Sequence, residues 1–341
     1  MVTQPRDWAE LGAYPVDVDV FRIPLPLPGD GLRAVNVYAI RTDQGLVVVD
    51  GGWALEESRR QFQWALKEIG ASLSDINRFL VTHAHRDHYT QAVAVRREYG
   101  TRVSLGVGER ESLVEMARPG AIHGGPQLVR LRRAGADPVI ERLLTARFDR
   151  PVDLTNWDLP DEWLDAGTTL PLDDRKLLAL PTPGHTRGHL VFADLGHRVL
   201  FAGDHVLPHI TPSIGFEYSV SASPLANYLS SLAAVRQLPD MLLLPAHGPV
   251  TESVHLRVDE LVAHHHERLQ ACRTAVTGGA RTGYEVAQAL RWTRRGRDLA
   301  TLDTFNQMLA TLEAAAHLDL LVAQGLLIEA SSSEVVRYTV A

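Results

Sequence analysis

The chain has 341 residues, a formal net charge of −7 and a hydrophobic content of 45%. This composition predicts a globular protein with room for two domains, and the negative charge gives no general attraction to nucleic acid. No apolar run approaches the length of a membrane span, no secretory signal is visible, and the single cysteine, Cys272, excludes an internal disulfide. We therefore expect a cytoplasmic protein.

Strands alternate with helices in the first hundred residues. Residues 36–40 and 45–49 are apolar and predict two strands. Residues 55–69 carry apolar side chains at helical spacing, and residues 89–99 predict a second helix. The order is typical of the α/β class.

A dense group of metal-binding side chains follows the apolar run 79–81. His83, His85, Asp87 and His88 lie within six residues, and zinc and similar divalent ions prefer imidazole nitrogen and carboxylate oxygen. The alternate residues His83 and His85 can converge on one ion. Asp87 and His88, on the turn that follows, are then free to reach a second ion. The alternative is a solvated polar turn.

Three further apolar segments end in the same way. His185 follows residues 177–180, Asp204 follows a strand at 199–200, and His247 follows residues 242–244. Each segment has the pattern of a buried strand that runs into Gly or Pro. Strand ends that deliver His and Asp to one rim of a sheet predict a metal cluster.

The ordered set of these residues resembles the metallo-β-lactamase fold superfamily, in its glyoxalase II and lactonase variant. The resemblance covers roughly residues 17 to 250 and implies a four-layer αββα sandwich. It also implies two metal sites that share one bridging carboxylate. The ligands it implies are His83, His85 and His185 for one metal, Asp87, His88 and His247 for the second, and Asp204 as the bridge.

The resemblance implies supporting residues as well. Asp50, within residues 46–52, matches the family's first motif, in which the Asp stands behind the ligands and the glycines make a tight turn. The family's ligand is the histidine directly after Pro-Gly, so His189 is expected to be a buried partner on the next strand. His205 and His209 are expected to line the pocket or to support the ligands.

The implied cofactor is a pair of divalent metal ions, with zinc as the default and iron or manganese as alternatives for the same ligands. A hydroxide that bridges the two ions would attack an electrophilic carbonyl, and Asp87 would orient this hydroxide as well as bind metal. The chain shows no Ser or Cys nucleophile motif, which favours attack by activated water.

Departures from family patterns narrow the expected substrate. His88 stands where one class of lactamases has Arg, and His85 stands where the di-iron flavoproteins carry Glu. Leu207 replaces the tyrosine of acyl-homoserine lactonases. The expected protein is a metal-dependent hydrolase of a carboxylic ester, thioester or lactone. The alternatives are an endoribonuclease or phosphodiesterase of the β-lactamase-like-2 type, a β-lactamase-type amide hydrolase, and a non-catalytic binding module.

The expected catalytic domain spans residues 1–250 and contains a helical insertion at 108–165. Helices are predicted at 109–116 and 138–144, with glycines and Pro126 as breaks between them. We interpret this insertion as a lid or wall over the metals. Its candidate pocket residues are Met116, His123, Phe148 and Trp157.

Residues 251–341 predict a second, mostly helical domain. Three helices and a final pair of strands are the order of a winged-helix-like unit, which resembles the C-terminal domain of the β-lactamase-like-2 subgroup. The basic run 291–297 allows a nucleic-acid interpretation, but we favour a packing surface because the whole chain is acidic. Residues 264–266, three histidines, are expected to form an exposed or interface face. The expected partners are a small acyl substrate and a possible second copy in a homodimer, without nucleic acid or membrane.

Overall fold

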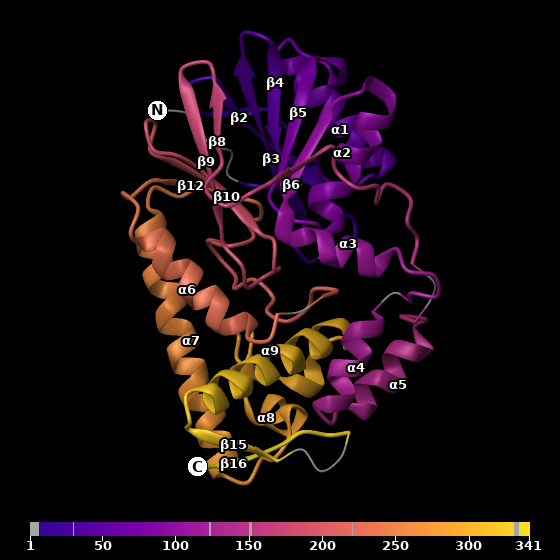
Figure 1. Cartoon of the computed structure of the whole chain (residues 1–341), viewed down its shortest axis with the longest axis vertical. Helices are drawn as coiled ribbons and strands as arrows, with labels where there is room; N and C mark the ends of the chain where they lie inside the picture. Colours follow the sequence, from indigo (N-terminus) through magenta and orange to yellow (C-terminus); the bar gives the residue numbers. More distant parts are fainter. Residues whose placement is uncertain (1–6, 30, 123, 150–151, 220, 331–333) are drawn as a thin grey trace.

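Two β-sheets that face each other form the centre of the fold (Figure 1). The computed structural model describes residues 7–29, 31–122, 124–149, 152–219, 221–330 and 334–341. His123, one of the candidate pocket residues, lies outside the described residues.

The first sheet has seven strands within the described residues, in chain order from one edge to the other. They are β1 (Tyr14–Asp17), β2 (Val20–Pro26), β3 (Ala34–Thr42), β4 (Gly45–Val49), β5 (Ile76–Val81), β6 (Arg102–Gly106) and β7 (Glu162–Leu164). Strands β1 to β4 pair antiparallel, and β4 to β7 pair parallel. Parallel neighbours need a crossover connection, which α1 (Glu56–Glu68) and α2 (Arg86–Tyr99) supply.

The second sheet has five strands in that part of the chain, in the order β12-β11-β10-β9-β8. They are β8 (Thr169–Leu172), β9 (Arg175–Pro181), β10 (Leu190–Asp194), β11 (Val199–Gly203) and β12 (Leu242–Pro245). Strands β8 to β11 pair antiparallel, while β11 and β12 pair parallel around the crossover helix α6 (Pro224–Arg236).

Apolar side chains fill both faces of both sheets. On β4, Val47 and Val49 point into the layer between the sheets, while Leu46 and Val48 point toward α1 and α2, because successive side chains of a strand face opposite sides. The outer face of the second sheet packs against α6 and α7 (Val254–Thr277). The order of layers is helix, sheet, sheet, helix, which confirms the predicted αββα sandwich of the α/β class.

Between β6 and β7 the described residues form three α-helices, which are α3 (Arg110–Met116), α4 (Gly125–Arg133) and α5 (Asp137–Thr145). The sequence predicted α3 and α5 but placed a break where α4 lies. Pro126 lies in the first turn of α4, a position at which the missing N–H of proline has no helical partner to lose. Helices α4 and α5 pack against α9 (Thr304–Ala323), as Figure 1 shows, in a core that includes Phe148.

The last ninety residues are mostly helical. Besides α7 and α9 they contain α8 (Gly283–Ala289) and two short strand pairs, β13 (Arg291–Trp292) with β14 (Arg297–Asp298) and β15 (Leu327–Ala330) with β16 (Arg337–Val340). The basic run 291–297 lies in a small hairpin. Short 3₁₀ helices lie at Leu73–Asp75, Val107–Glu109 and Leu299–Thr301.

One apolar core links the C-terminal helices to the second sheet. It includes Leu200 of β11, Leu232 of α6, Leu261 of α7 and Leu318 of α9. The boundary at residue 250 and the winged-helix-like character of residues 251–341 stay predictions. Among the described helices, none combines the length and apolarity that a bilayer crossing requires.

Candidate metal centre

The seven side chains predicted as metal ligands meet at one edge of the two sheets. The first sheet contributes through the end of β5 and the start of α2, and the second through the ends of β9, β11 and β12. Their potential ligand atoms form two groups, each within 4.8 Å. The groups are His83, His85, His185 and Asp204, and Asp87, His88 and His247.

In the first group, three imidazole nitrogens face one another. Nδ1 of His85 lies 2.9 Å from Nε2 of His83 and 3.1 Å from Nε2 of His185. Nitrogens bound at about 2.0–2.1 Å in a tetrahedron around zinc would lie roughly 3.3–3.4 Å apart. The spacing of the three rings therefore suits a single ion.

Asp204 lies between the two groups. Its Oδ2 is 3.4 Å from Nε2 of His185, and its Oδ1 is 3.3 Å from Nε2 of His247. Nε2 of His247 is also 3.4 Å from Oδ2 of Asp87, and Nε2 of His88 is 3.6 Å from the same oxygen. This geometry gives Asp204 one oxygen for each group, as a bridging carboxylate requires.

Hydrogen bonds behind the rings determine which nitrogen faces the centre. Nδ1 of His185 donates to the carbonyl oxygen of Ser213 at 2.8 Å, and Nδ1 of His247 donates to that of Ala34 at 2.8 Å. A neutral imidazole that donates through Nδ1 keeps its lone pair on Nε2. This arrangement is the usual support of a metal-binding histidine.

Asp50 and Thr82 orient two more rings. Nδ1 of His88 donates to Oδ2 of Asp50 at 2.9 Å. Nδ1 of His83 lies 3.0 Å from Oγ1 of Thr82, whose hydroxyl donates to Asp50. Asp50 thus supports one histidine of each group. Its φ of 61° places it in the left-handed region, which Asp adopts more readily than most residues.

Several polar atoms at the centre have no hydrogen-bond partner among the described residues. These buried atoms are Nε2 of His88, Nε2 of His247 and Oδ1 of Asp204. Buried polar groups without a partner are rare because they are costly. Divalent cations such as zinc satisfy a set of imidazole nitrogens and carboxylate oxygens of this kind. The residues present therefore fit a pair of metal ions.

Burial and nearby charges shift the pKa values of the histidines in opposite directions in the two groups. Burial lowers the pKa of His83, and it lowers that of His85 to about 3. Burial also lowers the pKa of His88, but Asp50, Asp87 and Asp204 raise it by more, to about 10. The three imidazoles of the first group are therefore neutral at neutral pH. The second must release a proton when a metal binds, which couples binding to pH.

Strand β3 fixes the loop that carries His247. Nδ2 of Asn36 donates to the carbonyl oxygens of Pro245 and Gly248, each at 2.9 Å. The hydroxyl of Tyr38 donates to Pro245 at 2.7 Å. These bonds connect the first sheet to the end of the second, so the two halves of the centre are rigidly related.

The predicted supporting histidines differ in position. His189 is fully buried, and its Nε2 accepts from the backbone N–H of Asp204 at 3.1 Å, so this nitrogen is engaged away from the ligands. His205 is buried, with its ring 5.2 Å from that of Tyr228. His209 is exposed next to Gly248 and is outside both groups.

Helix α2 begins earlier than predicted. It starts at Arg86, so Asp87 and His88 lie in its first turn rather than on a preceding turn. An acidic side chain in the first turn stabilises a helix because it faces the positive end of the helix dipole. The helix therefore fixes the spacing of Asp87 and His88.

Two buried carboxylic acids beside the centre were missed by the sequence analysis. Glu109 accepts a hydrogen bond from the hydroxyl of Thr186, and Glu217 accepts one from the backbone N–H of Arg187 at 2.6 Å. Burial raises the pKa of Glu109 to about 7 and that of Glu217 to about 8. Neither residue follows a motif, and only the folded chain brings both to the loop after His185.

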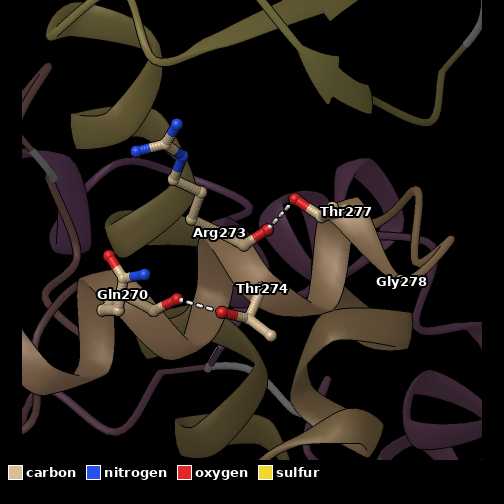
Figure 2. Close-up of a pocket in the computed structure, with 5 residues that line it drawn as sticks. All are labelled: Gln270, Arg273, Thr274, Thr277 and Gly278. Atoms are coloured by element: carbon tan, nitrogen blue, oxygen red, sulfur yellow. Dashed lines mark hydrogen bonds between the residues drawn. The ribbon is translucent and has the colours of Figure 1, made fainter.

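Figure 2 shows a depression at the C-terminal end of α7. It is lined by Gln270, Arg273, Thr274, Thr277 and Gly278. The hydroxyls of Thr274 and Thr277 donate to the carbonyl oxygens of Gln270 and Arg273, each at 3.0 Å. This lining offers no carboxylate, imidazole or thiol, so we assign the chemistry to the centre at the sheet edge.

Comparisons with known proteins identify the family of the chain. The family model described as "Metallo-beta-lactamase superfamily" matches residues 30–247. The chain is 25% identical over 333 residues to a "Probable metallo-hydrolase YqjP" of Bacillus subtilis, covering 90% of this chain and 93% of that protein. It is 25% identical over 238 residues to a "Beta-lactamase-like protein 2 homolog" of Caenorhabditis elegans, covering 70% of this chain but only 63% of that protein.

Two solved structures are similar over nearly the whole chain. A metallo-beta-lactamase family protein from Thermus thermophilus has 25% identity and a TM-score of 0.72, covering 96% of this chain and 100% of that one. A beta-lactamase domain protein from Burkholderia ambifaria has 26% identity and a TM-score of 0.76, covering 96% and 95%. Because the family model matches more than half of the sequence, the chain belongs to the metallo-beta-lactamase superfamily.

Proposed function

We propose that the protein hydrolyses a carboxylic ester, thioester or lactone at a centre that holds two divalent metal ions, with zinc as the default. The observation that carries this proposal is the convergence of seven His and Asp side chains into two groups that share Asp204. When bound, such a pair of ions supplies a water of lowered pKa and polarises a carbonyl oxygen.

Asp87 is our candidate for the catalytic carboxylate. Burial raises its pKa, but the charges of His88 and His247 lower it by more, so Asp87 is ionised at neutral pH. A carboxylate at this position can accept a hydrogen bond from the attacking water and orient it toward the carbonyl carbon.

The only cysteine does not offer a competing nucleophile. Cys272 is fully buried in α7, and burial raises the pKa of its thiol to about 12. A thiol in this state is not reactive because the thiolate is the nucleophile. The state of Cys272 therefore favours direct attack by water over a cysteine nucleophile.

The surroundings of the centre favour an acyl substrate over a polyanion. The ring of Phe216 lies 6.1 Å from that of His85, and the ring of Phe305 lies 5.5 Å from that of Phe216. This aromatic pair offers an apolar wall for an acyl group. The formal net charge of −7 is unfavourable for binding the phosphates of a nucleic acid.

A substrate panel tests the proposal. The full-length protein, zinc-loaded or treated with a chelator, would be assayed on an ester, a thioester, a lactone, a β-lactam and a phosphodiester. We expect hydrolysis of at least one of the first three, lost with the chelator and restored by zinc. Metal-dependent cleavage of only the phosphodiester or only the β-lactam would contradict the acyl assignment. A cytoplasmic location and a homodimer stay predictions.

A further inference from the structure

A second cluster of potential metal ligands lies between α7 and α9, outside the predicted centre. His265 belongs to α7, and Glu313 and His317 belong to α9. One ligand atom from each lies within 4.8 Å of the others. The two helices pack against each other in the lower half of Figure 1. The cluster therefore joins two segments that are about fifty residues apart in the chain.

The role of His265 differs from the one that the sequence predicted. We predicted residues 264–266 to form one exposed or interface face, but the structure divides them. His265 is fully buried, and His266 is exposed. Consecutive residues of a helix point about 100° apart, so only His265 can enter the core. Its two metal-binding neighbours come from another helix, which no local motif reveals.

The helix geometry of α9 places two ligands on one face. Glu313 and His317 are four residues apart, and such pairs are neighbours on a helix surface. Nε2 of His317 lies 3.2 Å from Nδ1 of His265, and the two rings are stacked with centroids 5.3 Å apart. The separation of the two nitrogens is close to the roughly 3.3–3.4 Å expected for two ligands of one tetrahedral zinc ion.

The orientation of His317 is the one that a metal-binding histidine needs. Its Nδ1 donates to the backbone carbonyl oxygen of Glu313 at 2.8 Å. The lone pair of the neutral ring is then on Nε2, the nitrogen that faces His265. His185 and His247 at the predicted centre are held by backbone carbonyls in the same way.

Burial favours the metal-binding form of both rings. It lowers the pKa of His265 to about 2 and that of His317 to about 4, so both imidazoles are neutral at neutral pH. A neutral imidazole nitrogen is a ligand that zinc prefers. Burial raises the pKa of Glu313, and the positive charge of Arg268 opposes this rise.

We propose that His265, Glu313 and His317 bind a further divalent metal ion, which ties α7 to α9. The N₂O donor set suits zinc. The alternative is a hydrogen-bonded histidine pair of an ordinary core, which needs no ion. The site is separate from the predicted centre, although the ring of Tyr228 lies between His205 and His265, at 5.2 and 5.4 Å. An ion here would stabilise the packing of the C-terminal helices rather than take part in hydrolysis.

Metal counting on the full chain tests this site. The wild type and His317→Gln would be stripped with a chelator, reloaded with zinc, freed of excess metal by gel filtration, and analysed for zinc per chain. We expect His317→Gln to hold one zinc fewer than the wild type. His266→Gln, an exposed neighbour on α7, is the matched control and is expected to keep the wild-type count.

The difference between variants is independent of how many ions the predicted centre holds and of which substrate is cleaved. If His317→Gln does not give a folded protein by circular dichroism, Glu313→Gln, which keeps the shape of the side chain, takes its place. The wild-type zinc count in a folded His317→Gln, or in the folded Glu313→Gln that replaces it, would overturn the proposal.

Discussion

Oδ2 of Asp50 accepts a hydrogen bond from Nδ1 of His88 at 2.9 Å, while the same carboxylate also accepts from the hydroxyl of Thr82 behind His83. One buried side chain thus orients a histidine of each metal group. Because such partners fix the ring and raise the basicity of its other nitrogen, their loss costs metal affinity.

Asp50→Asn is expected to weaken zinc binding by about 10- to 100-fold, the range typical of such supporting residues. Asn tolerates the left-handed backbone at this position, so the fold should persist. Competition with a chromophoric chelator measures the affinity. Asp19→Asn is the matched control, because Asp19 also has a positive φ (55°) but is exposed. Equal zinc affinity in both variants would refute the role of Asp50.

Gly203→Ala is expected to damage the centre through sterics. The φ of Gly203 is +51°, and a Cβ there would lie 2.7 Å from Nε2 of His189 and 2.8 Å from the side chain of Thr82. The positive φ alone costs roughly 1–2 kcal/mol for a residue with a Cβ. The clash adds to this, and it displaces two groups that hold the ligands. We expect both the free energy of unfolding and the zinc affinity to fall.

Gly70→Ala separates these two effects. Gly70 has a φ of +71°, and a Cβ at this position would meet no other atom within 4 Å. Denaturant unfolding should therefore show only the backbone penalty, with zinc affinity as in the wild type. A Gly203→Ala protein that binds zinc as tightly as Gly70→Ala would show that the region tolerates the clash.

Phe216→Ala is expected to reduce activity on apolar substrates selectively. The ring of Phe216 lies beside His85, and burial of an aromatic or aliphatic side chain is worth about 1.5–3 kcal/mol. We therefore expect kcat/KM for a long-chain acyl ester to fall about tenfold or more, and that for an acetyl ester to change little. Trp64→Ala, an exposed aromatic on α1, serves as control. An equal loss on both esters would exclude an acyl-binding role for Phe216.

Glu217→Gln is expected to change the pH dependence of stability. Burial raises the pKa of Glu217 from 4.5 to about 8, and the charge of Glu109 adds to this rise. The folded state thus prefers the protonated acid. Its contribution to stability is complete below about pH 4.5 and is lost as pH rises through about 8. Gln stays uncharged and still accepts from the N–H of Arg187.

The free energy of unfolding of Glu217→Gln relative to wild type should therefore increase between pH 5 and pH 9, by an amount on the order of a few kcal/mol. Both proteins would be measured in chelator so that metal does not contribute. Glu141→Gln changes an exposed residue on α5, so its free energy of unfolding should depend on pH as that of the wild type does. A parallel curve for Glu217→Gln as well would contradict the account of this acid.

Local patterns explain why much of the fold could be predicted. Residues 45–49 are apolar on both faces because helices cover one side of the sheet and the second sheet covers the other. His83 to His88 are adjacent in sequence, and His185, Asp204 and His247 each follow the end of a strand. Strand ends bring such residues to one edge, so their convergence was foreseeable.

The remaining features depend on tertiary contacts. A Gly-Gly-Pro sequence normally interrupts a helix, yet in α4 it forms the start, and the helix packs on α9. The pKa of Glu217 is raised because the fold buries this residue and places it near Glu109. His265 meets Glu313 and His317 across two helices. None of these relations has a sequence pattern of its own.

The central claim is that the seven side chains hold two metal ions. The most direct measurement is anomalous scattering at the zinc edge from crystals of the full chain grown with zinc. The account predicts two peaks on either side of Asp204, one beside His83, His85 and His185 and one beside Asp87, His88 and His247. A single peak or none at this sheet edge, with His185, Asp204 and His247 turned away, would contradict it.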